Sequence, residues 1–533
     1  MSENDSMNKD PVLSGVITPE KDAEDSIENY LYETRPFYRV NYLCVLAFHI
    51  FIITLTSTNN GFDGSMLNGL QSLTYWADYM GNPTGHILGA LTAGGIFGCF
   101  LIFFIAPWAC DKYGRRTVVI IGQAITLIGA ILQGLSTNYA FFLCSRLVIG
   151  AGSGLATIGA PTLISELSYP AHREACTFAY NICWYLGATV AAIVTYLTRN
   201  ISNNWCWRIP SYLQGFFPLV QLVFLLWVPE SPRFLVAKGK HDNARALLLK
   251  YHTGNSTDPR ASELVEFELR EIESALEAEK LAGASSKYSD FWYRPSYRKR
   301  IFLVLFIATM MQLSGNGLVS YYLNKVLNSI GITDTSKQLQ INMCLMIFNF
   351  VICVVCCATC HLFRRRTLFI TCVVGMLITY IIWTALSAEN EKQNFSNKSL
   401  ANGVLAMIFF YYMFYDIGIN GLPFLYVTEI LPYSHRAKGI NLFQFWMQIV
   451  LVYNSFVNPI AMDAISWKYY IVYCCILGVE TVVVILTFPE TSGRTLEEVA
   501  EVFGDVIDHG EAKLHQEFNE VKRTGSVEHL ESV

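Results

Sequence analysis

The chain has 533 residues, of which 53% are hydrophobic and only 15% are charged, whereas an average soluble protein has about 25% charged residues. A soluble protein this apolar could not cover its surface with polar side chains, so the composition excludes an ordinary multidomain soluble protein. The net charge of −5 and the short basic clusters at the ends of apolar segments make nucleic acid a poor candidate partner. Apolar stretches recur from about residue 41 to residue 488, and each approaches the roughly 20 residues that cross a bilayer. The sequence therefore predicts a polytopic membrane protein.

Residues 1–40 are polar and acidic, without an apolar core or a small-residue cleavage site, so they do not form a signal peptide. We expect a cytoplasmic tail. The apolar segments that follow predict an all-α membrane protein with twelve transmembrane helices. The expected ranges are 42–69, 85–108, 117–135, 140–165, 174–198, 209–228, 300–328, 339–362, 367–387, 401–428, 438–460 and 468–488.

An even number of spans places both termini on the same side of the membrane. Lys and Arg predominate in the loops on that side, and the positive-inside rule therefore predicts that both termini are cytoplasmic. Three glycosylation sequons, at Asn200, Asn394 and Asn397, then fall in outside loops. Asn4 and Asn255 match the same pattern but face the cytosol, so we expect them to stay unmodified.

The chain also repeats itself. Asp111-Lys-Tyr-Gly-Arg-Arg-Thr117 is echoed by His361-Leu-Phe-Arg-Arg-Arg-Thr367, and Pro229-Glu-Ser-Pro-Arg233 by Pro489-Glu-Thr-Ser-Gly-Arg494. Ser165-Glu166 with Arg173 recurs as Thr428-Glu429 with Arg436. All three pairs lie at the cytoplasmic ends of matching helices, which predicts two six-helix halves. Duplicated bundles that rock around a midplane site are the architecture of secondary transporters.

These motifs, together with the run Arg146-Leu-Val-Ile-Gly-Ala-Gly152 and Gln312-Leu-Ser-Gly315, resemble the sugar porters of the major facilitator superfamily over about residues 42–500. The stretches 60–71 and 454–461 look most similar to the fungal lactose-permease-like branch, which includes β-glycoside carriers. The resemblance implies a 41–228 N-terminal bundle, a 229–299 cytoplasmic loop with short helices, a 300–488 C-terminal bundle and a 489–533 cytoplasmic tail. It also implies a plasma-membrane location and function as a monomer.

Opposite charges lie together at the expected cytoplasmic helix ends. Asp111 stands beside Arg115 and Arg116, and Glu precedes Arg in the other motifs. The resemblance implies that such pairs hold the outward-facing state and separate when the cytoplasmic side opens, although helix-end charges also stabilise helices in their own right. The expected gate residues are Asp111, Arg115, Arg116, Glu166, Arg173, Glu230, Arg233, Asp416, Glu429, Arg436, Glu490 and Arg494.

Four ionisable residues, Asp63, Arg146, Asp416 and Glu480, lie inside apolar segments, where each costs ~2.5–3.5 kcal/mol at the bilayer centre. Such residues face the bundle interior or water, and they are functional candidates by default. In proton-coupled sugar porters, an acid in the first helix and an Arg in the fourth act as a pair. Asp63 and Arg146 occupy those positions, so the resemblance gives them the proton-coupling role; a static structural ion pair is the alternative. A structural role is favoured for Glu480.

A sugar presents hydroxyls and apolar ring faces, so its site needs amides, hydroxyls and aromatic rings. The candidates are Asn181, Gln312, Asn316, Tyr321, Tyr322, Gln444, Trp446 and Asn454; interhelical hydrogen bonds are the alternative for each, and are at least as good an interpretation for Asn349 and Gln448. Asn181 stands where many hexose carriers have Gln. Met311 and the order Asn316-Gly317 are further departures from the hexose pattern. The shorter Asn181 side chain leaves room for a larger substrate, which favours a disaccharide.

Other patterns are interpreted as structural. Gly150-Ala-Gly-Ser-Gly154 lies within an apolar helix and predicts close helix packing rather than a nucleotide loop. Cys353, Cys356, Cys357 and Cys360 share one expected helix and favour apolar packing over a metal site. Val265, Leu269, Ile272 and Leu276 follow helical spacing inside the 229–299 loop. No catalytic or ATP-binding motif is present, so we expect neither an enzyme nor a cofactor.

The sequence thus predicts a transporter that carries a disaccharide or hexose across the bilayer by alternating access, with protons as coupling ions. A passive facilitator of the same fold is an alternative. A sugar sensor with little transport is another, but the short tail after the last helix argues against it.

Overall fold

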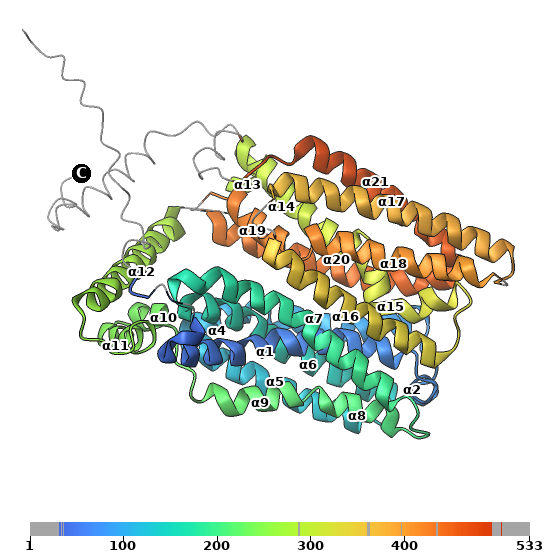
Figure 1. The fold of residues 1–533 in the computed structure, drawn as a ribbon, viewed down its shortest axis with the longest axis horizontal. Coiled ribbons are helices and arrows are strands. Elements are labelled where there is room, and N and C mark those ends of the chain that lie inside the picture. Colours follow the sequence, from blue (N-terminus) through green and yellow to red (C-terminus); the bar gives the residue numbers. More distant parts are fainter. Residues whose placement is uncertain are drawn as a thin grey trace, which may run out of the picture.

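The computed structural model describes residues 31–492, except 34, 36, 286–287, 360–362, 396 and 433–434, together with Phe503. A first group of helices forms the lower layer in Figure 1. It comprises α1 (Asn41–Leu70), α2 (Thr74–Tyr79), α3 (Gly85–Ile102), α4 (Ile105–Tyr113), α5 (Arg115–Leu135), α6 (Tyr139–Leu167), α7 (Arg173–Thr198), α8 (Trp205–Leu213) and α9 (Phe216–Leu225). Short 3-10 helices at Phe37–Arg39 and Pro170–His172 precede α1 and α7.

A second group forms the upper layer (Figure 1). It comprises α14 (Pro295–Leu313), α15 (Asn316–Asn328), α16 (Thr335–Thr359), α17 (Arg365–Lys392), α18 (Lys398–Gly418), α19 (Leu422–Ile430), α20 (Arg436–Ile465) and α21 (Tyr469–Thr487), with a 3-10 turn at Ser466–Lys468. The segment between the two halves holds α10 (Pro232–Ala237), α11 (His241–His252), α12 (Pro259–Ser285) and α13 (Asp290–Tyr293).

The helices agree with the predicted all-α bundle, and ten stretches of the described chain are long and apolar enough to cross a membrane. One of them, Lys438–Thr487, contains the last two predicted spans as α20 and α21. The span expected at 209–228 is instead divided at Gln214 and Gly215 into α8 and α9. The span expected at 300–328 breaks at Gly315, whose φ of 105° favours glycine. The span expected at 401–428 likewise breaks before Leu422.

Contacts between the halves run along α3 with α20, α7 with α16, and α1 with α15. Hydrogen bonds join them near α2, at the end of the bundle opposite α12; we name the two ends the α2 end and the α12 end (Figure 1). The Asn68 amide nitrogen donates to Asn342 Oδ1 at 3.3 Å, and its oxygen accepts from the Leu323 N–H at 3.2 Å. Gln71 Nε2 donates to the Tyr321 carbonyl at 2.8 Å.

Two further hydrogen bonds cross between the halves at the α2 end. The Gly85 N–H donates to Asp463 Oδ2 at 3.0 Å, which places a carboxylate at the N-terminus of α3. Arg199 Nε donates to Ser336 Oγ at 3.0 Å. In the described chain, the two halves are therefore joined by hydrogen bonds at the α2 end.

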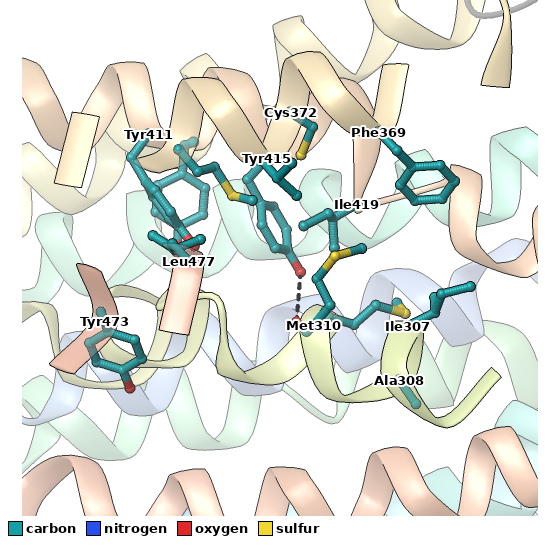
Figure 2. Close-up of a cluster of buried hydrophobic side chains, with 14 of the residues drawn as sticks. Ile307, Ala308, Met310, Phe369, Cys372, Tyr411, Tyr415, Ile419, Tyr473 and Leu477 are labelled. Atoms are coloured by element: carbon teal, nitrogen blue, oxygen red, sulfur yellow. Dashed lines mark hydrogen bonds between the residues drawn. The ribbon is translucent and has the colours of Figure 1, made fainter. Parts of the chain in front are cut away.

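Each half has its own core. In the second half, aromatic side chains of α18 and α21 pack with aliphatic residues of α14 (Figure 2). Tyr411, Tyr415 and Tyr473 are all buried. The Tyr415 hydroxyl donates to the Met311 carbonyl at 3.2 Å, next to the break between α14 and α15. The core thus satisfies a backbone carbonyl that the helix break releases.

The small residues of α6 allow close packing in the first half, as predicted. A Cβ added at Gly150 would lie 1.9 Å from the Gly95 carbonyl oxygen of α3, and one at Gly152 would lie 2.5 Å from the Thr126 nitrogen of α5. Because these neighbours are backbone atoms, they cannot move aside without shifting a helix.

The segment between the halves also agrees with the predicted helical stripe, although α12 is longer than the short helices expected there. Val265, Leu269, Ile272 and Leu276 of α12 pack in one cluster with α10 and α11. This cluster lies at the α12 end of the first half (Figure 1).

His252 attaches the segment to the end of α6. Its Nδ1 lies 2.9 Å from Glu268 Oε2 of α12, and its Nε2 lies 3.2 Å from the Leu167 carbonyl. Burial by itself lowers the pKa of His252, but the Glu268 carboxylate and the Leu167 carbonyl outweigh that effect, so the pKa is raised overall. Both ring nitrogens can donate only when the imidazole is protonated.

We expect Gly150→Ala to lower the free energy of unfolding by about 1–3 kcal/mol, the usual range for overpacking. Gly478→Ala is the matched control, because a Cβ there has nothing within 4 Å. Thermal unfolding of the two purified variants in detergent measures the difference. Equal melting temperatures would show that α3 and α6 are not tightly packed at Gly150.

The raised pKa of His252 predicts a pH-dependent contribution to stability. The contribution is fully present below the unfolded-state pKa of about 6.5 and is lost as pH rises through the higher folded-state value. Glu268→Gln should therefore lower the melting temperature most at mildly acidic pH and progressively less at alkaline pH. His241→Gln, which removes the solvent-exposed pair with Glu273, should change it little at any pH. A Glu268→Gln effect that is independent of pH would contradict the charged pairing.

Candidate functional site

The first part of the site is a buried charge cluster inside the first half. Arg146 of α6 forms an ion pair with Asp63 of α1, through Nη1 and Oδ1. Gln214, in the break between α8 and α9, donates from Nε2 to the same Asp63 oxygen at 2.7 Å. The side chain of Arg146 is 4% exposed and that of Asp63 is 20% exposed. Three helical segments therefore converge on one carboxylate.

The buried surroundings make the ion pair between Asp63 and Arg146 costly to break. A buried ion that loses its partner costs several kcal/mol, and Arg146 Nε has no hydrogen-bond partner among the described residues. Gly95 of α3 leaves room for the guanidinium, since a Cβ there would lie 3.3 Å from Arg146 Nη2. Asp63 is thus the anion that Arg146 contacts in the described cluster, and neutralising Asp63 would remove it.

The second half approaches this cluster through Tyr321. A Cβ at Gly64, the residue after Asp63, would lie 4.0 Å from Tyr321 Cε1 and 3.6 Å from Trp184 Cζ2 of α7. The break in α15 around Tyr322, whose φ of −137° is not helical, lies next to this position. The Asp63 cluster therefore faces the boundary between the halves.

A cavity lies at the same boundary, formed by α7 of one half with α16, α18 and α19 of the other. It is partly open, and its empty space, counted together with open solvent at the mouth, is about 530 Å³. Asn181 and Asp416 line it, together with Asn420, Cys353 and Phe178. The Asp416 carboxylate accepts from the Tyr185 hydroxyl of α7 at 2.7 Å, and its other oxygen has no partner among the described residues. The cavity wall thus contains two amides and a carboxylate among otherwise apolar residues.

The remaining predicted sugar residues lie on α14, α15 and α20. Asn316 donates to the Tyr415 hydroxyl at 3.0 Å and accepts from Tyr412 at 3.1 Å, while Trp446 is 38% exposed and donates to Thr309. Gln312 and Gln444 are partly exposed. These side chains retain surface that a ligand could contact.

Tyr322 and Asn454 have interhelical contacts instead. The Tyr322 hydroxyl donates to the Ser455 carbonyl at 2.6 Å, and Asn454 Nδ2 donates to the Gln312 carbonyl at 2.8 Å. Asn454 Oδ1 also accepts from Tyr473 at 3.3 Å. Both side chains are at least 98% buried, so these bonds fix α15 and α20 in place and a direct sugar contact stays a prediction.

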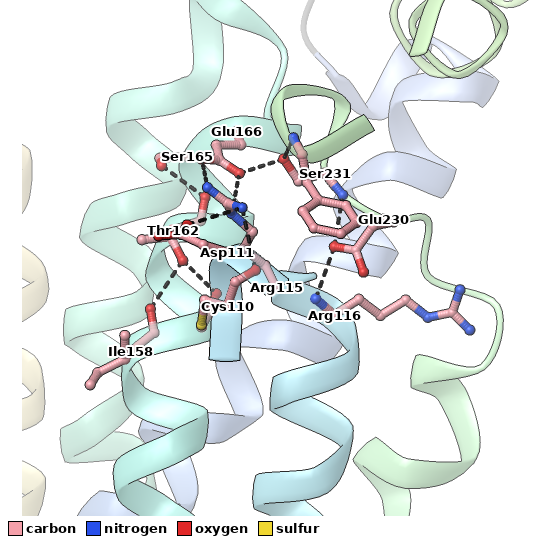
Figure 3. A network of polar contacts seen from close by, with 12 residues as sticks. Cys110, Asp111, Arg115, Arg116, Ile158, Thr162, Ser165, Glu166, Glu230 and Ser231 are labelled. Carbon is pink, nitrogen blue, oxygen red and sulfur yellow. Dashed lines mark hydrogen bonds and ion pairs between the residues drawn. The ribbon is translucent and has the colours of Figure 1, made fainter. Parts of the chain in front are cut away.

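A charge network joins helices at the α12 end of the first half (Figure 3). Arg115 Nε lies 3.2 Å from Glu166 Oε2, and Asp111 lies 3.6 Å from the same guanidinium. The Ser231 hydroxyl donates to Glu166. Glu230 accepts from the Arg116 N–H at 3.0 Å, which places a carboxylate at the N-terminus of α5. The start of α10 is thereby joined to α5 and α6.

The second half repeats this network with matching residues. Arg365 Nε lies 3.6 Å from Glu429 Oε1, and the Thr491 hydroxyl donates to Glu429 at 2.5 Å. Glu490 accepts from the Arg365 and Arg366 N–H groups, at 3.1 and 3.3 Å, at the N-terminus of α17. Arg116 and Arg366 also match, since each donates to carbonyls at the end of the last helix of its half.

In the first half, one pairing differs from the one that the motifs suggested. Glu166 pairs with Arg115 because the start of α5 is nearer than that of α7; Arg173 lies with Arg233 in the lining of a second cavity beside Glu166.

For the other gate candidates, the gate role stays a prediction. Arg436 begins α20, and Arg494 lies outside the described residues. Asp416 is apart from the α12-end charges and lines the cavity between the halves, so a gate role for it stays a prediction.

Glu480, for which a structural role was favoured, is buried, and its carboxylate oxygens have no partner among the described residues. Asn349 is also buried, and neither of its amide atoms makes the expected interhelical hydrogen bond among the described residues. The sequons Asn200, Asn394 and Asn397 lie at exposed positions of the α7–α8 and α17–α18 connections, at the α2 end. Glycosylation there stays a prediction.

The sequence reasoning missed several members of these clusters. Gln214 was a buried amide in an apolar segment, directly before Gly215, and that pattern could have identified it. Arg365 stood in the second copy of the repeat, aligned with Arg115. Tyr185 gave no signal, because its partner comes from the other half.

Comparisons with known proteins agree with the fold and the motifs. The family model described as "Sugar (and other) transporter" matches residues 49–503. The low-affinity glucose transporter HXT1 of Saccharomyces cerevisiae is 27% identical and aligns with 88% of this chain and 83% of its own. The MFS-type transporter criB of Aspergillus cristatus is 26% identical and aligns with 83% of this chain and 88% of its own.

Among solved structures, the inward-open xylose transporter XylE from E. coli superimposes with a TM-score of 0.70, at 20% identity, over 86% of this chain and 99% of its own. This likeness shows the fold. The relatives are transporters rather than enzymes. The chain belongs to the sugar transporter family of the major facilitator superfamily.

Proposed function

We propose that this protein carries a sugar across the plasma membrane together with protons, by alternating access, as a monomer with both termini in the cytoplasm. The observation that supports coupling is the Asp63–Arg146–Gln214 cluster, in which a carboxylate is paired with a buried cation beside the boundary between the halves. A group of this kind can exchange a proton only when its partner is free to rearrange.

The two halves supply the conformational change. Hydrogen bonds hold them together at the α2 end in this structure, so in the proposed orientation it is the inward-facing state. When Asp63 is protonated, Arg146 loses its anion, and the preferred arrangement of α1 against α15 changes. A ligand shifts such an equilibrium only through its different affinity for the two states.

The duplicated charge networks keep each half rigid while it moves. Each network joins helices of one half, through Arg115–Glu166 in the first and Arg365–Glu429 in the second. We assign the gating role to the approach of these two charged surfaces in the outward-facing state.

Two features bear on the substrate. Relatives named as glucose transporters favour a hexose, whereas Asn181 in the cavity wall has a shorter side chain than the Gln of many hexose carriers, which favours a disaccharide. Asp416 in the same cavity can accept hydrogen bonds from sugar hydroxyls.

Asp63→Asn mimics the neutral carboxyl at nearly unchanged size. In vesicles with an imposed proton gradient, we expect it to abolish sugar accumulation above equilibrium, while exchange at equal pH persists. Asp242→Asn, at an exposed position of α11, is the control and should accumulate sugar as the wild type does. If Asp63→Asn still concentrates sugar, Asp63 has no coupling role. If the wild type never exceeds equilibration, the protein is a passive facilitator or a sensor.

Asn181→Gln should narrow the cavity. We expect uptake of cellobiose or lactose to fall by about tenfold or more, the result of 1.4 kcal/mol of steric cost, while glucose uptake changes little. Uptake of the labelled sugars into transporter-null cells measures this, with Asn243→Gln on exposed α11 as the control. An equal loss for all three sugars would place Asn181 in a structural role.

A further inference from the structure

A second repeat, distinct from the charged motifs, precedes the first long helix of each half. Phe37-Tyr-Arg-Val-Asn-Tyr42 leads into α1, and Trp292-Tyr-Arg-Pro-Ser-Tyr297 leads into α14. Both segments follow the same pattern, which is an aromatic residue, Tyr, Arg, any residue, Asn or Ser, and Tyr. We name these two segments the collars.

The first two aromatic residues of each collar point to the outside of the protein. Phe37 and Tyr38 are 47% and 64% exposed, and Trp292 and Tyr293 are 64% and 82% exposed. The final tyrosine of the second collar, Tyr297, is in contrast only 4% exposed. The collars are thus anchored to the protein on one side and present large aromatic rings on the other.

An arginine lies beside a tyrosine ring in each collar. Arg39 lies 5.9 Å from the Tyr38 ring, and Arg294 lies 5.4 Å from the Tyr297 ring. Arg298 and Lys299, one turn into α14, are also exposed. No ion pair involves these four cations among the described residues.

The acids nearest in sequence already have partners. Glu33 is paired with Arg35, and Asp290 lies 2.9 Å from His435 Nε2. These two acids therefore do not pair with the four collar cations.

We propose that the two collars bind the headgroups of anionic phospholipids in the leaflet at the α12 end. The collars stand where membrane-spanning helices begin, at the depth where Trp and Tyr rings prefer to lie. Lys and Arg at this depth attract anionic lipid by about 1 kcal/mol each. A separate protein partner fits less well, because the two collars belong to different halves that move relative to each other. Each half is thus tethered to the same leaflet by its own lipids.

The test compares phosphatidylserine with phosphatidylcholine on the full-length protein. The wild type and the fourfold variant Arg39→Gln, Arg294→Gln, Arg298→Gln, Lys299→Gln are purified from vesicles of mixed phosphatidylcholine and phosphatidylserine. Native mass spectrometry then counts the lipids that each protein retains. We expect the wild type to retain phosphatidylserine preferentially. Each removed cation should weaken that preference about fivefold, the factor that corresponds to 1 kcal/mol.

Two controls separate charge from folding. Lys238→Gln with Lys240→Gln removes exposed cations at the same end, away from the collars, and should leave the preference unchanged. Arg39→Lys with Arg294→Lys keeps the charge and should retain it. Should the fourfold variant fail to fold, the wild-type preference must still fall as salt is raised, because exposed charges are screened.

Three outcomes would overturn the proposal. They are an unchanged lipid preference in the fourfold variant, a wild-type preference that is insensitive to salt, and an equal loss of the lipid preference in the control variant Lys238→Gln with Lys240→Gln. A change in the fraction of dimers without a change in retained lipid would identify the collars as a protein interface and would equally reject the lipid assignment.

Discussion

The ion pair between Asp63 and Arg146 is the constraint on which the rest of the proposed mechanism depends. Neither charge is stable inside the bundle without the other, and the described neighbours offer Gln214 as the further polar contact to the carboxylate. The pair joins α1 to α6, while the break between α8 and α9 brings in Gln214. Because α1 also carries Asn68 and Gln71, which bond to the second half at the α2 end, a change in the pair acts on the same helix that closes that end.

The two halves carry matching charge networks, which in the proposed mechanism allow each half to move as a rigid unit. Glu230 and Glu490 stand at matching helix N-termini, and Ser231 and Thr491 donate to matching glutamates. Each set of charges is satisfied within its own half. In the proposed mechanism, the contacts that must break are the hydrogen bonds at the α2 end. The neutral ones contribute about 0.5–1.5 kcal/mol each, and those of Asp463 and Arg199, which involve a charged group, contribute about 1.5–3 kcal/mol each.

Much of this architecture could be predicted from the sequence. Apolar length located the helices, since a bilayer fixes the length of a span, and the repeated Asp-x-x-x-Arg-Arg and Pro-Glu motifs revealed the two halves. The pair of Asp63 and Arg146 followed from the resemblance to proton-coupled sugar porters. The breaks at Gly215, Gly315 and Gly421 were not predicted, because hydropathy does not register a helix interruption inside an apolar segment.

Partners across helices were harder to predict than the residues themselves. Glu166 was expected with Arg173 but pairs with Arg115, since closeness in sequence says little about which helix ends meet. Contacts between the halves, such as Tyr185 with Asp416, leave no periodic signal in a single sequence. The collars were not predicted from the sequence, because their repeat is aromatic rather than charged. The exposure of their side chains, on which the lipid proposal depends, is known only from the structure.

The most direct test of proton coupling measures charge movement rather than sugar. Wild-type protein in vesicles, with equal pH and no voltage on the two sides, is exposed to a sudden rise in external sugar while the current is recorded. The account predicts a transient inward movement of positive charge that follows the sugar concentration. Sugar uptake without any charge movement would contradict it, and would reduce the Asp63–Arg146 pair to a structural contact.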